Sequence, residues 1–260
     1  MNSPPQGRED DGDAMAAARA EGPQSEEASL SRKVVAELVG TYFLTLVSAG
    51  IEVVAVLKPG HIDRSIKAAA SGLVVLTMIY AVGDVSGAHL NPVVTLVFGL
   101  RRSFTSWHVP IYWVAQISAA IGAALTLRGL FGTTGDVGIN RLHELTAGKG
   151  VAIEAIFTGL LVIVILNAAH KHSLIGTQAA LAVGATITVC SLVGGELTTM
   201  SMNPARSLGP AIVAGKSTDL WIYILGPAIG ALAALAIVTV LRPRRNPDEH
   251  QAAEGEGSHR

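Results

Sequence analysis

Two Asn-Pro pairs, Asn91-Pro92 and Asn203-Pro204, stand at corresponding places in the two halves of the chain. An Asn side-chain oxygen readily accepts hydrogen bonds from the first N–H groups of a helix, and Pro is favoured at the first helical position. Each pair therefore predicts the start of a short helix inside an apolar stretch. The amide hydrogens of the Asn and the positive end of the helix dipole would then face a passing molecule. Such groups select a solute by hydrogen bonding and by charge.

The composition indicates the surroundings of these pairs. Of the 260 residues, 50% are hydrophobic and 15% are charged, and the mean hydropathy is +0.45, which is too apolar for an ordinary soluble domain. Apolar stretches long enough to cross a ~30 Å hydrocarbon core lie at about 34–57, 68–83, 108–131, 151–170, 178–195 and 219–241. Two shorter stretches, 88–100 and 200–213, hold the Asn-Pro pairs and would reach about half-way across at about 1.5 Å per residue. We expect an all-α membrane protein with six transmembrane helices and two re-entrant half-helices.

Carboxylates inside the apolar spans mark an internal repeat. Glu37 and Thr41 are four residues apart in the first span, and Glu154 and Thr158 have the same spacing in the fourth, which puts each pair on one helix face. Three spans and a half-helix, used twice, form one repeated unit. Because three crossings are an odd number, the second copy must enter from the opposite side of the membrane. The sequence therefore predicts inverted repeats at about 32–131 and 150–243, whose half-helices meet near the midplane.

The ends of the chain differ from this central region of 32–243. Residues 1–31 and 244–260 are polar, so we expect them to be disordered. We expect a multi-pass protein of the cell membrane. The last span is followed by Arg242, Arg244 and Arg245, and this basic cluster favours both termini in the cytoplasm. Cys190 is the single cysteine, which excludes an intrachain disulfide. Neither a cofactor nor a nucleic-acid partner is expected.

The segments around the two pairs carry a resemblance to a known family. They read Ser86-Gly87-Ala88-His89-Leu90-Asn91-Pro92-Val93 and Ser201-Met202-Asn203-Pro204-Ala205-Arg206. The chain resembles the aquaporin, or major intrinsic protein, family over about 32–243, and looks closest to its nodulin-26-like branch. The resemblance implies that Glu37 and Glu154 support the two loops by accepting backbone N–H bonds. We interpret His89 as a packed residue of the first loop, since no second ligand stands at metal-binding spacing.

By the family's spacing, the narrowest part of the pore would be lined by Ser71, Ser191, Met200 and Arg206. The strict water channels of the family have an aromatic residue and a histidine at the first two positions, so the serines would widen the aperture. Met200 stands where the family usually has a small residue, and its flexible side chain could refill the space. Val93 replaces the usual Ala of the first motif.

The resemblance implies a passive channel and a homotetramer with one pore in each subunit. The expected solutes are water and small uncharged molecules such as glycerol, urea or metalloid hydroxides, and ions and protons would be excluded. No enzyme activity is expected, because the sequence shows no paired nucleophile and base. The alternative is a secondary transporter, which also uses inverted repeats and broken helices. Its coupling normally needs ionisable groups inside the membrane, and here the spans offer little beyond Glu37 and Glu154.

Overall fold

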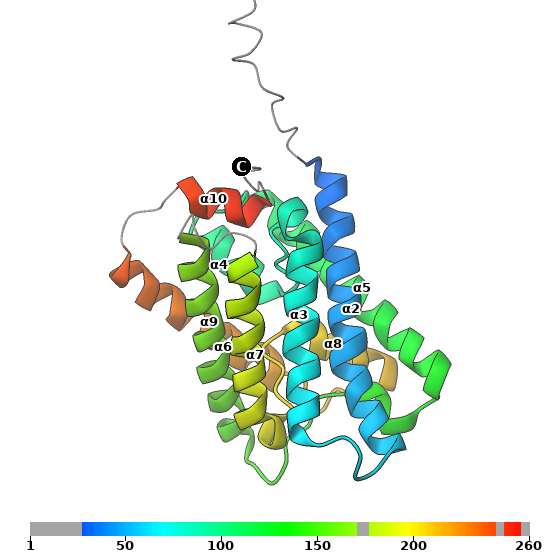
Figure 1. Cartoon of the computed structure of the whole chain (residues 1–260). Helices are drawn as coiled ribbons and strands as arrows, with labels where there is room; N and C mark the ends of the chain where they lie inside the picture. The colour runs from blue at the N-terminus through cyan, green and yellow to red at the C-terminus, as the bar shows by residue number, and fades with distance from the viewer. Residues whose placement is uncertain (1–27, 171–176, 243–246, 256–260) are drawn as a thin grey trace, which may run out of the picture.

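The computed structural model describes residues 28–170, 177–242 and 247–255, and within these ranges six long helices form one bundle (Figure 1). They are α2 (Leu30–Leu57), α3 (Arg64–Ser86), α5 (Val109–Phe131), α6 (Ala147–His170), α7 (Thr177–Thr198) and α9 (Ile222–Leu241). Each is long and apolar enough to cross a membrane. The predicted spans agree with these helices to within a few residues, and the all-α fold is confirmed.

Two short helices lie inside the bundle, α4 (Pro92–Leu100) and α8 (Pro204–Ala214). The Asn91 oxygen accepts a hydrogen bond from the Val93 N–H at 3.1 Å, and the Asn203 oxygen accepts one from the Ala205 N–H at 3.0 Å. Each helix thus begins at its proline, as the Asn-Pro pairs predicted, and the first residues of the apolar stretches 88–100 and 200–213 precede the helix. The residues before the two Asn caps form loops, in which Ala88, Leu90, Thr199, Met200 and Met202 all have positive φ.

The long helices pack in the same way in both halves. Helix α2 packs on α5, α6 packs on α9, and α3 of the first half packs on α7 of the second. At Gly230 of α9 a Cβ would lie 2.0 Å from the Ala155 carbonyl oxygen of α6, so only glycine permits this approach. The corresponding Gly122 of α5 has only a Tyr42 ring carbon nearby, at 3.8 Å. The two halves share a plan but differ in how closely their helices pack.

Three short elements complete the structure: the 3-10 helices η1 (Ser106–His108) and η2 (Thr134–Gly138), and helix α10 (Pro247–Glu254). Figure 1 shows α10 lying across the end of the bundle from which α2 begins. We call this end, where α2 begins and α9 ends, the terminus side, and the opposite end, which carries η2, the distal side.

The expectation of a disordered tail over 244–260 differs from the structure, because 247–254 is helical. The segment 247–254 is polar, but its carboxylates and alanines contact buried residues of the bundle. Composition alone does not reveal these contacts. The predicted N-terminal tail lies outside the described residues, except for the last few residues before and at the start of α2.

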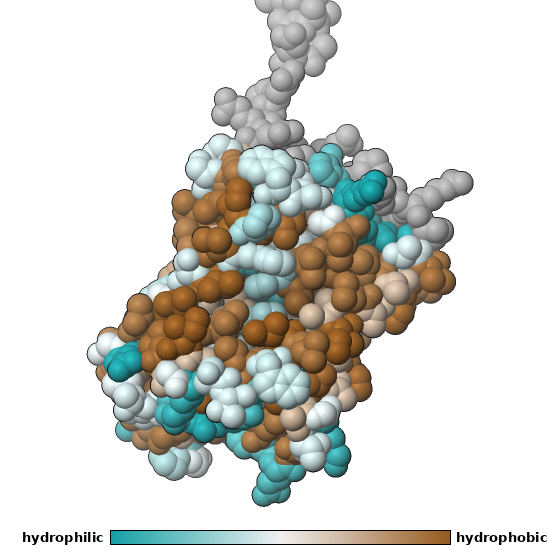
Figure 2. Space-filling view, turned by 180° about the vertical axis from the view of Figure 1, so that it is seen from behind, coloured by the Kyte–Doolittle hydropathy of each residue, from teal (hydrophilic) through white to brown (hydrophobic). Residues whose placement is uncertain are grey.

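The outer surface of the bundle is largely apolar. Figure 2 shows hydrophobic residues over much of one face, with hydrophilic residues gathered toward the ends. Large apolar side chains exposed on this surface include Val35, Leu73, Val114, Leu125, Ile156 and Val240. Such an exterior suits contact with lipid.

Candidate functional site: a cavity beside the two half-helices

A cavity of about 410 Å³ lies between the long helices and passes both half-helices. Its wall includes most of the residues that the sequence analysis singled out: Ser71, His89, Asn91, Ser191, Met200, Asn203 and Arg206. The other motif residues, Pro92, Val93, Pro204 and Ala205, form the first turns of α4 and α8 and are buried. Val93 packs in a hydrophobic cluster with Phe98, so its extra methyl groups contact protein.

The two Asn side chains join the loops to each other. The Asn91 Nδ2 group donates a hydrogen bond to the Met202 carbonyl at 2.8 Å, and Asn203 Nδ2 donates to the Leu90 carbonyl, also at 2.8 Å. We expected these amides to donate into the lumen. Since a side-chain amide has two hydrogens and one is used here, the second N–H of each Asn is not needed for the contact between the loops, and both residues line the cavity.

Glu37 of α2 lies behind the first loop and is fully buried. One carboxylate oxygen accepts the His89 N–H at 2.8 Å, and the other accepts the Leu90 N–H at 2.8 Å. The Ser86 hydroxyl donates to it at 2.9 Å and the Gln116 amide at 2.8 Å. These four bonds satisfy a charged group that would otherwise be costly to bury, and they hold Leu90 at its φ of 50°.

Glu154 of α6 holds the second loop in the same way. Its oxygens accept the Ser201 N–H at 3.0 Å, the Met202 N–H at 2.8 Å and the Thr198 hydroxyl at 2.8 Å. The spacing of the two glutamates identified this pair. Sequence reasoning missed Gln116, although an amide in an otherwise apolar span was a usable signal.

Arg206 is buried, and neutral oxygens hold its guanidinium group. Nη1 donates to the Gly138 carbonyl at 2.9 Å and to the Asn140 side-chain oxygen at 2.8 Å, and Nη2 donates to the Ser48 carbonyl at 3.0 Å. These hydrogen-bond partners carry no charge, so Arg206 contributes its positive charge to the cavity wall without a carboxylate bonded to it among the described residues. No sequence signal connected Gly138 or Asn140 with Arg206.

Met200 lies against α7, where Gly194 leaves room for it. A Cβ at Gly194 would lie only 1.8 Å from the Met200 terminal methyl carbon and 3.4 Å from a ring carbon of Phe157. The Met200 side chain therefore occupies the space that a side chain at position 194 would take. Ser71 comes from α3 and Ser191 from α7, so the two serines line the cavity from different helices.

His89 is packed among aromatic rings. Its imidazole stacks on Phe98 with a centroid distance of 4.9 Å, meets Phe104 edge-on at 4.7 Å, and places Nδ1 3.2 Å from the Thr95 hydroxyl. Over the part of the chain that the structure describes, no three His, Cys, Asp or Glu residues gather as metal ligands would.

Comparisons with known proteins give the family. A family model described as Major intrinsic protein matches residues 24–238. The chain is 39% identical to Probable aquaporin NIP4-2 of Arabidopsis thaliana, with 82% of this chain and 75% of that protein covered. It is 41% identical to Aquaporin NIP1-1 of Oryza sativa subsp. japonica, covering 83% and 76%.

A solved structure, the aquaglyceroporin from Plasmodium falciparum, has the same fold. The TM-score is 0.75 at 24% identity, and the alignment covers 83% of this chain and 98% of that one. Together with the match to the family model and to the plant aquaporins, this likeness leads to one conclusion: the chain belongs to the major intrinsic protein family of membrane channels.

Proposed function

We propose that this passive channel conducts, besides water, at least one small uncharged solute such as glycerol, urea or a metalloid hydroxide. The observation that carries this proposal is the place of Met200. Its methyl carbon lies against Gly194 of α7 while the residue still lines the cavity, and we infer from this position that the side chain leaves open the aperture beside Ser71 and Ser191. Two small hydroxyl-bearing side chains then leave space for a molecule larger than water and give it hydrogen-bond partners.

The same geometry opposes the passage of charge. Helices α4 and α8 begin at Asn91 and Asn203, and each positive helix end, equivalent to about half a charge, is directed at the middle of the cavity. Arg206 adds a full positive charge at the distal end. We assign to the two Asn amides the task of orienting a solute, and to Glu37 and Glu154 the task of supporting the loops.

Stopped-flow light scattering on proteoliposomes tests this proposal, with an impermeant osmolyte for water and with glycerol and urea gradients for solutes. The double variant Ser71→Phe with Ser191→His should reduce solute flux more than water flux, because it narrows the aperture. The matched control is Ser118→Phe, whose serine is exposed on α5. An equal loss of water and solute flux in the double variant would contradict the proposed filter.

We also propose a homotetramer in the cell membrane with the terminus side in the cytoplasm. The apolar exterior can serve helix contacts between subunits as well as lipid contacts. The arginine that ends the last span, Arg242, lies on the terminus side. A secondary transporter is not favoured, since the chain belongs to a family of channels. That membership is also the reason for assigning no enzyme activity.

A further inference from the structure

Helix α10 covers the terminus-side end of the cavity. Gln251, Ala252 and Gly255 belong to the cavity wall, together with Asp84 and Gly87 at the end of α3. A segment that is remote from both half-helices in sequence thus forms part of the path proposed above for solutes.

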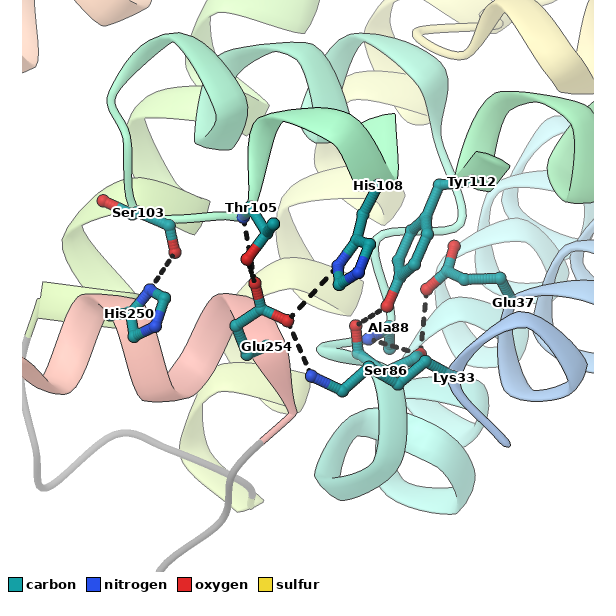
Figure 3. Close-up of polar contacts among 10 residues, drawn as sticks. All are labelled: Lys33, Glu37, Ser86, Ala88, Ser103, Thr105, His108, Tyr112, His250 and Glu254. Carbon is teal, nitrogen blue, oxygen red and sulfur yellow. Dashed lines mark hydrogen bonds and ion pairs between the residues drawn. The ribbon is translucent and has the colours of Figure 1, made fainter. Parts of the chain in front are cut away.

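The last residue of α10, Glu254, is buried and contacts two segments at the terminus-side end of the cavity, which we call the mouth (Figure 3). It accepts hydrogen bonds from Lys33 Nζ of α2 at 2.6 Å, and from the Thr105 backbone N–H and hydroxyl at 2.9 and 2.7 Å. His108 Nδ1 lies 3.9 Å away. Burial alone would raise the pKa of Glu254, but the bonds from Lys33 and Thr105 outweigh it and hold this pKa below its ordinary value.

A second buried carboxylate fixes the start of the helix. Glu249 pairs with Arg101, which follows the end of α4, and accepts the Ser103 hydroxyl at 2.8 Å. His250 Nδ1 donates to the Ser103 carbonyl at 3.0 Å. Both ends of α10 are therefore held by charged or polar contacts to the connection between α4 and α5.

Gly255 lets α10 approach the mouth closely. Its φ is +82°, and a Cβ there would lie 2.4 Å from the Val85 carbonyl carbon and 2.5 Å from the Ser86 nitrogen. Those atoms are backbone, so they cannot move aside as a flexible side chain would. Two residues earlier, Ala253 is fully buried in a hydrophobic cluster with Phe98 and Tyr112.

We propose that α10 is an autoinhibitory lid, which restricts flux through the terminus-side mouth while docked and opens that mouth when it leaves. The docked contacts are local to the mouth, and Gln251 and Ala252 face the cavity there. A helix of eight residues is too short to persist alone in water, so release would also unfold it. The inference rests on the solute path proposed above.

The experiment compares two Gly→Ala variants of the full chain. Gly255→Ala introduces the clash with the backbone of α3. Gly60→Ala is the matched control, because Gly60 has nearly the same φ of +80° and no atom within 4 Å of the added Cβ. Docking is followed by hydrogen exchange of the amides of residues 247–254, and flux by water permeability of proteoliposomes per reconstituted channel.

We expect Gly255→Ala to speed exchange in α10 and to raise water permeability several-fold, while Gly60→Ala changes neither. If the amides of α10 stay protected from exchange in Gly255→Ala, the double variant Glu249→Gln with Glu254→Gln is tested instead. Hydrogen exchange of residues 247–254 and water permeability are measured for it in the same way. Faster exchange with unchanged, measurable permeability would overturn the lid and leave the channel proposal standing. Absence of water flux in every variant, with α10 released, would count against the proposed path itself and so against the lid.

Discussion

At the scale of single residues, a buried carboxylate accepts hydrogen bonds from the backbone of each strained loop. Leu90 and Met202 have φ near +50°, a conformation that costs a non-glycine residue about 1–2 kcal/mol. Their N–H groups donate to Glu37 and Glu154, and such charge-assisted bonds are about twice as strong as neutral ones. The carboxylates thus stabilise a backbone that would otherwise relax away from the cavity.

Replacing Glu37 by Gln should lower the thermal stability of the protein. Both oxygens of Glu37 accept a backbone N–H, so either orientation of the Gln amide turns its NH₂ group toward a donor. We expect a loss of about 2–4 kcal/mol in unfolding free energy. Cys190 is the single cysteine and is fully buried, so its labelling by a thiol-reactive dye reports unfolding directly. Glu196→Gln, at an exposed site, is the control, and identical melting of the two variants would refute this role of Glu37.

Gly194→Ala should narrow the pore, although Gly194 itself is not among the residues that line the cavity. The added Cβ would meet the Met200 methyl carbon at 1.8 Å, so the thioether must swing away from α7. We expect glycerol and urea flux to fall by a larger factor than water flux. Gly195→Ala, the neighbouring position with nothing within 4 Å, should leave both unchanged. Equal fluxes in the two variants would show that Met200 does not control the aperture.

The sequence predicted which residues reach the cavity better than how they are held there. Asn91, Asn203, Ser71 and Arg206 followed from spacing and family resemblance. The direction of Met200 did not, because three rotatable bonds leave a methionine free until its neighbours are known. The contacts of Arg206 with Gly138 and Asn140 were also missed. Contacts between residues far apart in the chain leave no local sequence pattern.

At the scale of elements, apolar length located the six spans and the Asn-Pro pairs located both half-helices. These signals are local, and the structure differs by only a few residues at the helix ends. Helix α10 was missed because its stability comes from docking: a short polar segment reads as disordered until its partners Lys33 and Arg101 are in place.

Acidification of the terminus side should release α10. Because the docked Glu254 has a pKa below its ordinary 4.5, docking is strongest above the undocked pKa and weakens as pH falls through the docked value. The titratable groups near Glu254 are Lys33 of α2, His108 of η1, His89 of the first loop and Tyr112 of α5. In a His108→Gln background, which removes an imidazole that ordinarily titrates near 6.5, we expect water permeability to rise below about pH 4.5.

The comparison for this titration is Glu254→Gln in the same background. It lacks the titrating carboxylate, so its permeability should be high already near neutral pH and should change little on acidification. Parallel pH profiles for the two proteins would show that Glu254 does not couple protons to the docking of α10.

At the scale of the whole molecule, the inverted repeat brings two helix starts to one place from opposite sides. Three long helices, α5, α6 and α7, separate the two half-helices, so α4 and α8 enter from opposite sides. Their starts meet beside the cavity, where Asn91 and Asn203 join the two loops. The sequence predicted this arrangement from a parity argument alone. It did not predict that the halves differ in packing, as Gly122 and Gly230 do.

This arrangement predicts flux without coupling. Asp84 lines the cavity only at its terminus-side end, and Glu37 and Glu154 are fully buried with their oxygens occupied by loop donors. These carboxylates are therefore not placed to carry protons between the two sides. Glycerol flux into proteoliposomes should therefore rise in proportion to the glycerol gradient, without saturation. It should also stay the same when a protonophore collapses an imposed proton gradient, provided that the terminus side stays above the pH at which α10 is released. Saturation, or a change on collapse of that gradient, would instead indicate a transporter that cycles between two states, because a continuously open path has no step that a proton gradient drives.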